Sequence, residues 1–264
     1  MASRTKQKEE ARARRLAEER ARAQRAQRDK RLKMIGGIVL AGVAIVAVLV
    51  AISSGGGSSE TGKQTGTQAK QTVASVNSLL NGIPQNGAIL GNPKAPVTMT
   101  YYGDLECPIC KAFTLQGGFP QLVSKDVRDG KVKVVYKAFE TATRDPNVFK
   151  NQQVAALAAG RQQKFWDFAE LFYREQGAED TGYVNEDYLQ GLAKQVPGLS
   201  LTKWESDRND GALANQIAAD GAQGTKAGVT GTPTLVFSGP KGEAATPEAV
   251  PSYSDLQQVI QKVQ

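Results

Sequence analysis

The chain divides into four segments that differ in their pattern of hydrophobic and polar residues. Residues 1–33 are mostly charged or small polar residues, whereas residues 34–52 form an apolar run without a single charge. Residues 53–85 are again polar and rich in Gly, Ser, Thr and Gln, and residues 86–264 have the mixed pattern of a globular domain. The pattern predicts a solvated basic tail, a membrane helix, a flexible linker and one folded domain.

The uncharged run 34–52 has the length of a transmembrane helix. At about 1.5 Å per residue it nearly matches a hydrocarbon core of about 30 Å. Lys30, Arg31 and Lys33 flank its N-terminal end, so the positive-inside rule predicts a single-pass cell-membrane protein with a cytoplasmic N-terminus and an extracytoplasmic domain. A cleaved signal peptide ending near Ala51-Ile52-Ser53 is the alternative. The long leading segment and the long apolar run favour an uncleaved anchor.

Within residues 86–264, the pattern predicts the order strand, helix, strand, several helices, strand, helix. This order indicates an α/β domain with an inserted helical segment at about residues 141–225. Phe165, Phe168 and Phe172 share one helical stripe, which we interpret as the core of the insertion rather than as a peptide-binding groove. The expected elements are strands 97–102, 132–139 and 234–237, a helix over 107–127 with a break near Gly117, Gly118 and Pro120, helical stripes at 188–196 and 213–218, and a helix over 254–263.

The formal net charge of +7 is confined to the N-terminal tail. Residues 1–33 hold 13 of the 33 Lys+Arg and 5 of the 26 Asp+Glu, which leaves 20 basic and 21 acidic residues for the remainder. The folded part therefore has no electrostatic support for nucleic-acid binding. The chain also contains no histidine, which removes every Ser–His or Cys–His catalytic arrangement.

The chemical signal is the pair Cys107 and Cys110, which follows an expected strand and opens an expected helix. A helix N-terminus stabilises a thiolate through its unpaired N–H groups and its dipole, so Cys107 is the expected nucleophile. Cys110 lies one turn further on the same face, where it can resolve a mixed disulfide. A zinc half-site is disfavoured because the chain offers two thiols and no imidazole. A static disulfide closing so short a loop would stabilise little.

A second motif strengthens this interpretation. Ala95-Pro96-Val97, Asp104 and Cys107-Pro108-Ile109-Cys110, together with Gly228-Val229-Thr230-Gly231-Thr232-Pro233-Thr234, resemble the DsbA-like branch of the thioredoxin fold, in which a helical domain is inserted. The resemblance covers residues 86–264. It implies a cis Pro233 beside the cysteine pair and a Thr232 backbone that pairs with extended substrate. It also implies that Pro108 and Ile109 support the site. An ordinary turn or strand-start proline is the alternative for Pro233.

Two positions depart from the best-known DsbA pattern. Ile109 stands where His often precedes the second cysteine, and Glu106 adjoins Cys107; neither favours a thiolate. Both indicate a less oxidising pair and leave the direction of electron flow open. We interpret Glu106 as a first-turn acid stabilised by the helix dipole. Asp104 and Glu140 are candidate proton acceptors for Cys110; the alternative for each is a surface acid at the end of a strand.

These observations favour an extracytoplasmic protein thiol–disulfide oxidoreductase. It would form disulfides in cysteine-containing secreted or envelope proteins and would be reoxidised by a membrane redox partner. The chemistry requires no metal and no organic cofactor. One alternative is a disulfide reductase or isomerase kept reduced by a membrane partner, with which Thr232 is compatible. The other is a non-catalytic peptide-binding module with a vestigial cysteine pair.

Overall fold

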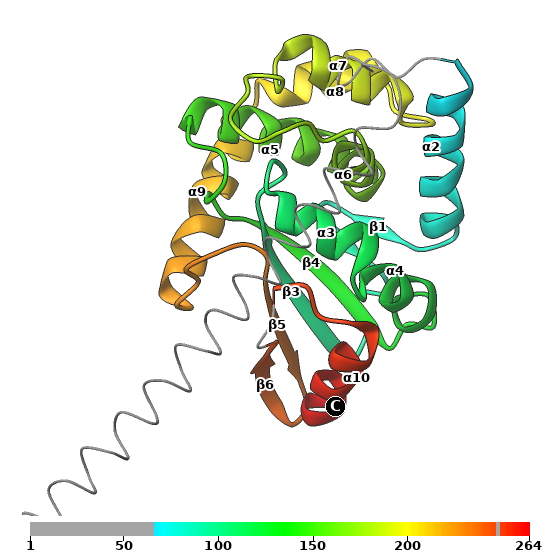
Figure 1. The fold of residues 1–264 in the computed structure, drawn as a ribbon, viewed down its shortest axis with the longest axis vertical. Coiled ribbons are helices and arrows are strands. Elements are labelled where there is room, and N and C mark those ends of the chain that lie inside the picture. The colour runs from blue at the N-terminus through cyan, green and yellow to red at the C-terminus, as the bar shows by residue number, and fades with distance from the viewer. Residues whose placement is uncertain (1–65, 247–248) are drawn as a thin grey trace, which may run out of the picture. The chain divides into compact units, whose positions relative to one another are not determined.

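The computed structural model describes residues 66–246 and 249–264. Its centre is a six-stranded sheet of order β1-β2-β4-β3-β5-β6 (Figure 1). The β3–β4 pair is parallel, whereas the pairs at either side are antiparallel. The strands are β1 Gln85–Asn86, β2 Ile89–Leu90, β3 Val97–Gly103, β4 Val132–Ala138, β5 Thr234–Gly239 and β6 Gly242–Ala245.

The two central strands are built from β-branched and aromatic residues that alternate in burial. In β4, every second residue from Val132 to Ala138 is buried, while the residues between them are partly exposed. Tyr101 of β3 lies opposite Tyr136 of β4, and their rings make an edge contact at 5.4 Å. Such cross-strand pairs stabilise a sheet and fix its register. The three strands predicted from the sequence are confirmed.

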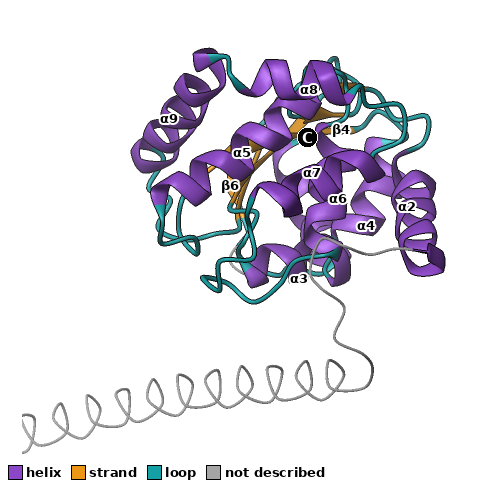
Figure 2. Cartoon of the chain, turned by 90° about the horizontal axis from the view of Figure 1, so that it is seen from above, coloured by secondary structure: helices purple, strands orange, loops and turns teal. Residues whose placement is uncertain are grey.

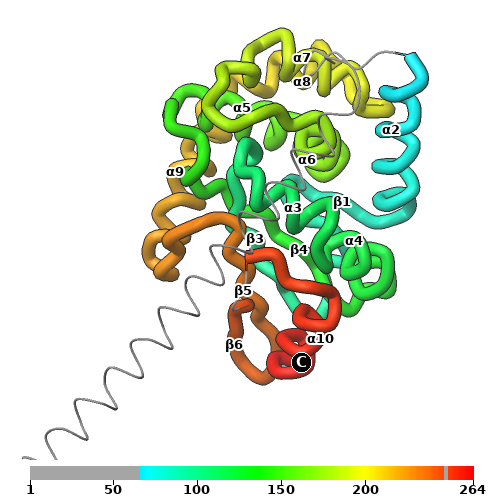
Figure 3. The backbone as a smooth tube through the Cα atoms, viewed as in Figure 1, coloured from blue at the N-terminus to red at the C-terminus, as the bar shows by residue number. Residues whose placement is uncertain are grey.

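Helices surround this sheet, and five of them, α5 to α9, lie between β4 and β5 in the sequence. In Figure 3 the chain leaves the sheet after β4, passes through these five helices and returns as β5. Seen from above, they cover the sheet (Figure 2). The α/β class and the helical segment are thus confirmed. The helices are α2 Gly66–Leu80, α3 Pro108–Gln116, α4 Phe119–Leu122, the π-helical turn η1 Val123–Val127, α5 Pro146–Gly160, α6 Phe165–Arg174, α7 Glu186–Gln195, α8 Leu201–Arg208, α9 Gly211–Lys226 and α10 Tyr253–Val263.

The break predicted near Gly117 and Gly118 is confirmed, and the structure explains it. Helix α3 ends there and α4 begins, while the first residues of α10 pack against the junction. A Cβ atom on Gly118 would lie 2.7 Å from the backbone of Ser252 and Tyr253. Only glycine allows this close approach, which brings the start of α10 against the junction of α3 and α4.

The helical insertion and the sheet share one hydrophobic core. Phe165, Phe168 and Phe172 are fully buried, which confirms that their stripe belongs to the core and leaves no groove for a peptide along it. Trp166 of the same helix stacks on Phe119 of α4 and donates its indole N–H to the carbonyl of Ala88. The insertion is therefore attached to the part of the fold that holds the cysteines.

Helix α2 lies inside the segment 53–85 that the sequence predicts to be a flexible linker, so that prediction is wrong for residues 66–80. Val76 and Leu80 are buried, and α2 packs against α6 and η1. Arg128 donates to the carbonyl oxygens of Leu79 and Asn81, both at 2.8 Å. The segment is mostly polar, but it has a few apolar residues at helical spacing. These residues are sufficient to stabilise a helix once they pack against α6.

The predicted basic tail 1–33 and transmembrane helix 34–52 lie outside the described residues. Among the helices of residues 66–246 and 249–264, none has both the length and the apolar character needed to cross a membrane.

Helix α2 provides a stability test. Replacing the buried Leu80 by Ala leaves a cavity in the hydrophobic core, so we expect the free energy of unfolding to fall by about 2–5 kcal/mol. The exposed Ser78 of the same helix is the matched control, and Ser78→Ala is expected to change it by no more than about 0.5 kcal/mol. Urea unfolding of the full chain measures both. Equal effects of the two substitutions would show that α2 is not packed as described.

Candidate active site

The two cysteines sit at the start of α3, directly after the loop that follows β3. Cys107 is the N-cap residue and Pro108 occupies the first helical turn, where a missing N–H costs nothing. The Cys107 sulfur accepts a hydrogen bond from the backbone N–H of Cys110 at 3.4 Å. A thiolate at this position also faces the positive end of the helix dipole. The predicted placement of the pair at a helix start is confirmed.

The two sulfurs have very different surroundings. Both cysteines are free thiols; Cys107 is 5% exposed, whereas Cys110 is fully buried. A hydrogen bond from the Cys110 thiol lowers the pKa of Cys107 to about 7, assisted by Thr232 and by the backbone N–H groups of Ile109 and Cys110, against the opposing effect of burial. Burial raises the pKa of Cys110 well above its ordinary value. Cys107 therefore loses its proton more readily than Cys110, which stays protonated near neutral pH.

The loop before β5 completes the site. The peptide bond between Thr232 and Pro233 is cis, as the resemblance to the DsbA-like branch implies. The Cys107 sulfur lies 3.4 Å from the carbonyl oxygen of Thr232, although 125 residues separate them. Pro108 is exposed, and Ile109 is 45% exposed. The structure thus brings together the six predicted site residues, with Pro108 and Ile109 forming the surface beside Cys107.

A buried carboxylate organises the loops around the cysteines. Asp104 is fully buried, and its two oxygens accept hydrogen bonds from six donors at 2.7–3.2 Å. These donors come from the loop before α3, from the loop after β4 and from α5. They are the backbone N–H groups of Glu106, Thr141, Ala142 and Thr143, the Thr143 hydroxyl and the Gln152 amide.

Of the three acidic residues near the pair, Glu140 is an exposed acid, which is one of its two predicted roles, whereas Asp104 and Glu106 are buried. Among the hydrogen bonds of the described residues, none joins the carboxylate of Asp104 or Glu140 to Cys110; the first is occupied by six donors and the second is exposed. Glu106 precedes the N-cap and so lies outside the first turn of α3. It is buried, which raises its pKa, and it accepts the Asp180 N–H at 3.0 Å. Its interpretation as a first-turn acid is therefore wrong.

Comparison with known proteins agrees with this geometry. A family model described as thioredoxin matches residues 84–261. The chain belongs to the thioredoxin family. Disulfide bond formation protein D of Bacillus subtilis is 28% identical over 155 residues, which cover 56% of this chain and 65% of that protein. The probable disulfide bond formation protein D of Bacillus cereus is 25% identical over 153 residues, which cover 57% of this chain and 69% of that protein.

A solved structure shows the same fold. The crystal structure of oxidised BdbD from Bacillus subtilis superposes with a TM-score of 0.58 at 22% identity, over 70% of this chain and 97% of that chain. This thioredoxin-family chain is a protein thiol–disulfide oxidoreductase. It contains only two cysteines, so Cys107 and Cys110 are its candidate redox pair.

Two residues of the site carry no signal in the sequence. The Thr141 hydroxyl is hydrogen-bonded to the Thr232 hydroxyl. The side-chain amide of Gln176, in the loop after α6, donates to the carbonyl oxygens of Leu105 and Cys107 at 2.7 and 3.1 Å. Both lie in irregular segments far along the chain, and only the folded loops bring them to the thioredoxin motif.

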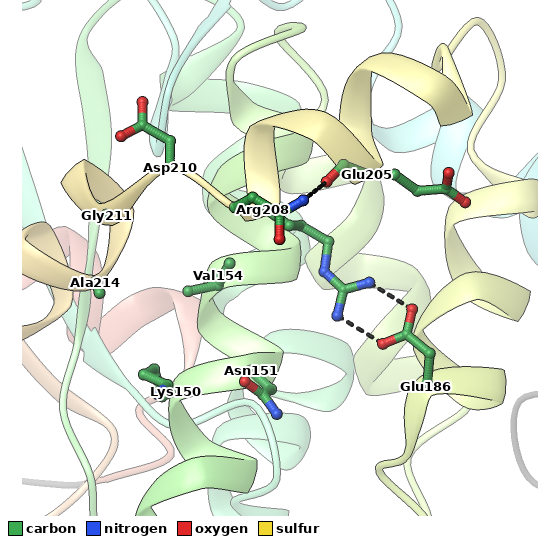
Figure 4. Close-up of a pocket in the computed structure, with 10 residues that line it drawn as sticks. Lys150, Asn151, Val154, Glu186, Glu205, Arg208, Asp210, Gly211 and Ala214 are labelled. Carbon is green, nitrogen blue, oxygen red and sulfur yellow. Dashed lines mark hydrogen bonds and ion pairs between the residues drawn. The ribbon is translucent and has the colours of Figure 1, made fainter.

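A separate polar pocket of about 560 Å³ lies between α5, α7, α8 and the start of α9 (Figure 4). Arg208 and Glu186 form a two-pronged ion pair across it, with N–O distances of 2.6 and 2.7 Å. Neither cysteine lines this pocket, and its most buried cation is already paired. It is therefore not part of the candidate active site.

Asp104 provides the stability test of the site. Asp104→Ala removes the acceptor for six donors, most of them buried, so we expect the free energy of unfolding to fall by at least about 3 kcal/mol. Asp129, whose side chain is 56% exposed in an ion pair with Lys131, is the matched control. Asp129→Ala is expected to change stability by about 0–1 kcal/mol. Denaturant unfolding compares the two variants, and a small effect of Asp104→Ala would contradict the role assigned to this carboxylate.

Proposed function

We propose that this chain forms disulfides in cysteine-containing secreted or envelope proteins, by dithiol–disulfide exchange at Cys107 and Cys110. The single observation that carries this proposal is that the two sulfurs differ in acidity and in burial. Cys107 has its pKa lowered to about 7 at the mouth of α3, whereas Cys110 is fully buried behind it. A substrate sulfur can therefore reach only Cys107, and Cys107 is the better leaving group when the mixed disulfide is resolved by substrate.

The oxidising reaction runs in two exchanges. A substrate thiolate attacks the Cys107 sulfur of the Cys107–Cys110 disulfide, the S–S bond breaks, and Cys110 leaves as a thiolate and takes up a proton. A second thiolate of the substrate then attacks the substrate sulfur that is bonded to Cys107. The mixed disulfide breaks and Cys107 leaves as a thiolate. The substrate has lost two electrons and the enzyme pair has gained them. A membrane redox partner that accepts these two electrons restores the disulfide.

The names of the relatives support the oxidising direction, because the proteins of Bacillus subtilis and Bacillus cereus are disulfide bond formation proteins. We place the catalytic domain outside the cytoplasm, where disulfides persist, anchored by an uncleaved helix over residues 34–52. The uncharged run and the flanking Lys30, Arg31 and Lys33 support this topology.

One observation favours a second candidate, a disulfide reductase or isomerase kept reduced by a membrane partner. The pKa of about 7 for Cys107 resembles the value of about 7 in thioredoxin, a reductant, more than the value of about 3.5 in the strongly oxidising DsbA. The reduction potential of the pair separates the two candidates. A value near −120 mV indicates an oxidase, and a value near −270 mV indicates a reductase.

A trapping experiment tests the roles of the two sulfurs. Cys110→Ser removes the resolving thiol, so we expect a mixed disulfide with a cysteine-containing protein to accumulate, with the link mapped to Cys107 by mass spectrometry. Cys107→Ser is the matched control and is expected to trap nothing. We also expect Cys107→Ser to lose the oxidative refolding of a reduced disulfide protein. Parent-level refolding by Cys107→Ser would refute the proposed function.

A further inference from the structure

The reactivity of Cys107 depends on where its backbone lies. The N–H of Cys110 donates to the Cys107 sulfur at 3.4 Å, and the same sulfur lies 3.4 Å from the carbonyl oxygen of Thr232. Both of these partners are backbone groups, and the exposed side chain beside the pair, Ile109, is apolar. A rotation of the N-cap residue would therefore move the sulfur away from the N–H groups that stabilise its thiolate.

The side chain of Gln176 holds the turn that leads into α3. Its amide nitrogen donates to the carbonyl oxygens of Leu105 and Cys107, at 2.7 and 3.1 Å. The Cys107 carbonyl also accepts the backbone N–H of Lys111, and the Cys107 N–H donates to the carbonyl of Asp104, both at 3.1 Å. Gln176 is only 8% exposed, so its two hydrogen bonds are shielded from competition with water. One buried side chain thus fixes two carbonyls of the turn.

The loop that carries Gln176 is itself attached to the cysteine-bearing helix. The ammonium group of Lys111, near the start of α3, donates to the backbone carbonyl of Gln176 at 3.2 Å. Further along the same loop, the N–H of Asp180 donates to the buried carboxylate of Glu106 at 3.0 Å. The contacts run in both directions, because α3 donates to the loop and the loop donates to the residues before α3. The loop after α6 and the start of α3 therefore form one hydrogen-bonded unit.

We propose that Gln176 is a positioning residue for disulfide exchange, which holds the backbone of Cys107 so that the sulfur faces the N–H groups at the start of α3. This role rests on the proposed function, in which Cys107 is the attacked and the leaving sulfur. Among the hydrogen bonds of the described residues, those of Gln176 involve carbonyl oxygens and an ammonium group, so it acts through the main chain. The helical insertion then contributes to the chemistry of the pair as well as to the core.

The alignment of the Cys107 sulfur stabilises the thiolate, and a stabilised thiolate favours the reduced pair over the disulfide. Loss of the Gln176 amide is therefore expected to raise the pKa of Cys107 and to make the disulfide a weaker oxidant. The second effect depends on pH, because only the thiolate gains from the alignment. It is large at alkaline pH, where the thiolate forms, and it disappears at acidic pH, where Cys107 is protonated in any case.

Equilibration of the full chain with glutathione tests this role. Two glutathione thiols reduce the Cys107–Cys110 disulfide to the dithiol and become glutathione disulfide. Gln176→Met keeps the length of the side chain and removes both hydrogen bonds to the turn. We expect the pKa of Cys107, measured from the pH dependence of its alkylation rate, to rise from about 7 to roughly 8. The equilibrium constant is expected to fall by roughly 5-fold at about pH 8 and to stay unchanged at about pH 5.

Gln162→Met is the matched control, since Gln162 also binds backbone in the insertion. Its amide donates to the carbonyl of Ser200 at 3.1 Å and accepts the N–H of the same residue at 2.9 Å, at the start of α8. We expect this variant to lower the urea midpoint but to leave the Cys107 pKa and the glutathione equilibrium as in the parent. Gln176→Asn is a second test variant that carries the test if Gln176→Met does not fold. Its shorter side chain stays polar but cannot span both carbonyls, so the same direction of change is expected.

Parent-like pKa values and equilibrium constants in the folded Gln176 variants would overturn the role of Gln176. A change of equal size at about pH 5 and about pH 8 would also overturn it, since that result indicates a structural effect on the disulfide alone. Equal shifts in Gln162→Met would overturn it too, because they would follow from general destabilisation of the insertion. Failure of the proposed function has another signature, which is parent-level oxidative refolding by Cys107→Ser.

Discussion

The buried carboxylate of Asp104 is the interaction on which the geometry of the site depends. It accepts six hydrogen bonds from the loop before α3, the loop after β4 and helix α5. An ionised or strongly polar group buried in this way is tolerated only when its oxygens are satisfied. The three segments are therefore held in one arrangement, because any movement of a loop would leave the carboxylate without donors.

The chemistry of the cysteine pair follows from that arrangement. With the loop before α3 fixed, Cys107 becomes the N-cap of the helix and faces both its N–H groups and the loop at Thr232. Cys110, one turn further on, is directed into the core beneath the tyrosines of β3 and α6. The two thiols are chemically identical, but their positions on the helix make Cys107 reactive and leave Cys110 shielded from solvent. Neither a cofactor nor a charged partner is needed for this difference.

The sequence predicts those parts of the site that local patterns determine. The spacing of Cys107 and Cys110 places both on one face of a helix, and the Thr-Pro pair before a strand marks the adjoining loop. The contacts that sequence reasoning missed join residues far apart in the chain. Asp104 and Gln152 are 48 residues apart, and Thr141 and Thr232 are 91 apart. Helix α2 was missed for the same reason, since its few apolar residues gain their stability from α6, which no local pattern reveals.

The central claim is that the fold makes Cys107 a reactive thiolate and protects Cys110. It is tested most directly by measuring the alkylation rate of each cysteine in the reduced, folded chain as the pH rises, with the modified residue identified by mass spectrometry. The account predicts that Cys107 alone is modified and that its rate rises with a midpoint near 7, the value to which its pKa is lowered. Equal rates at the two sulfurs, or a midpoint near the value of about 8.5 for a free thiol, would contradict it.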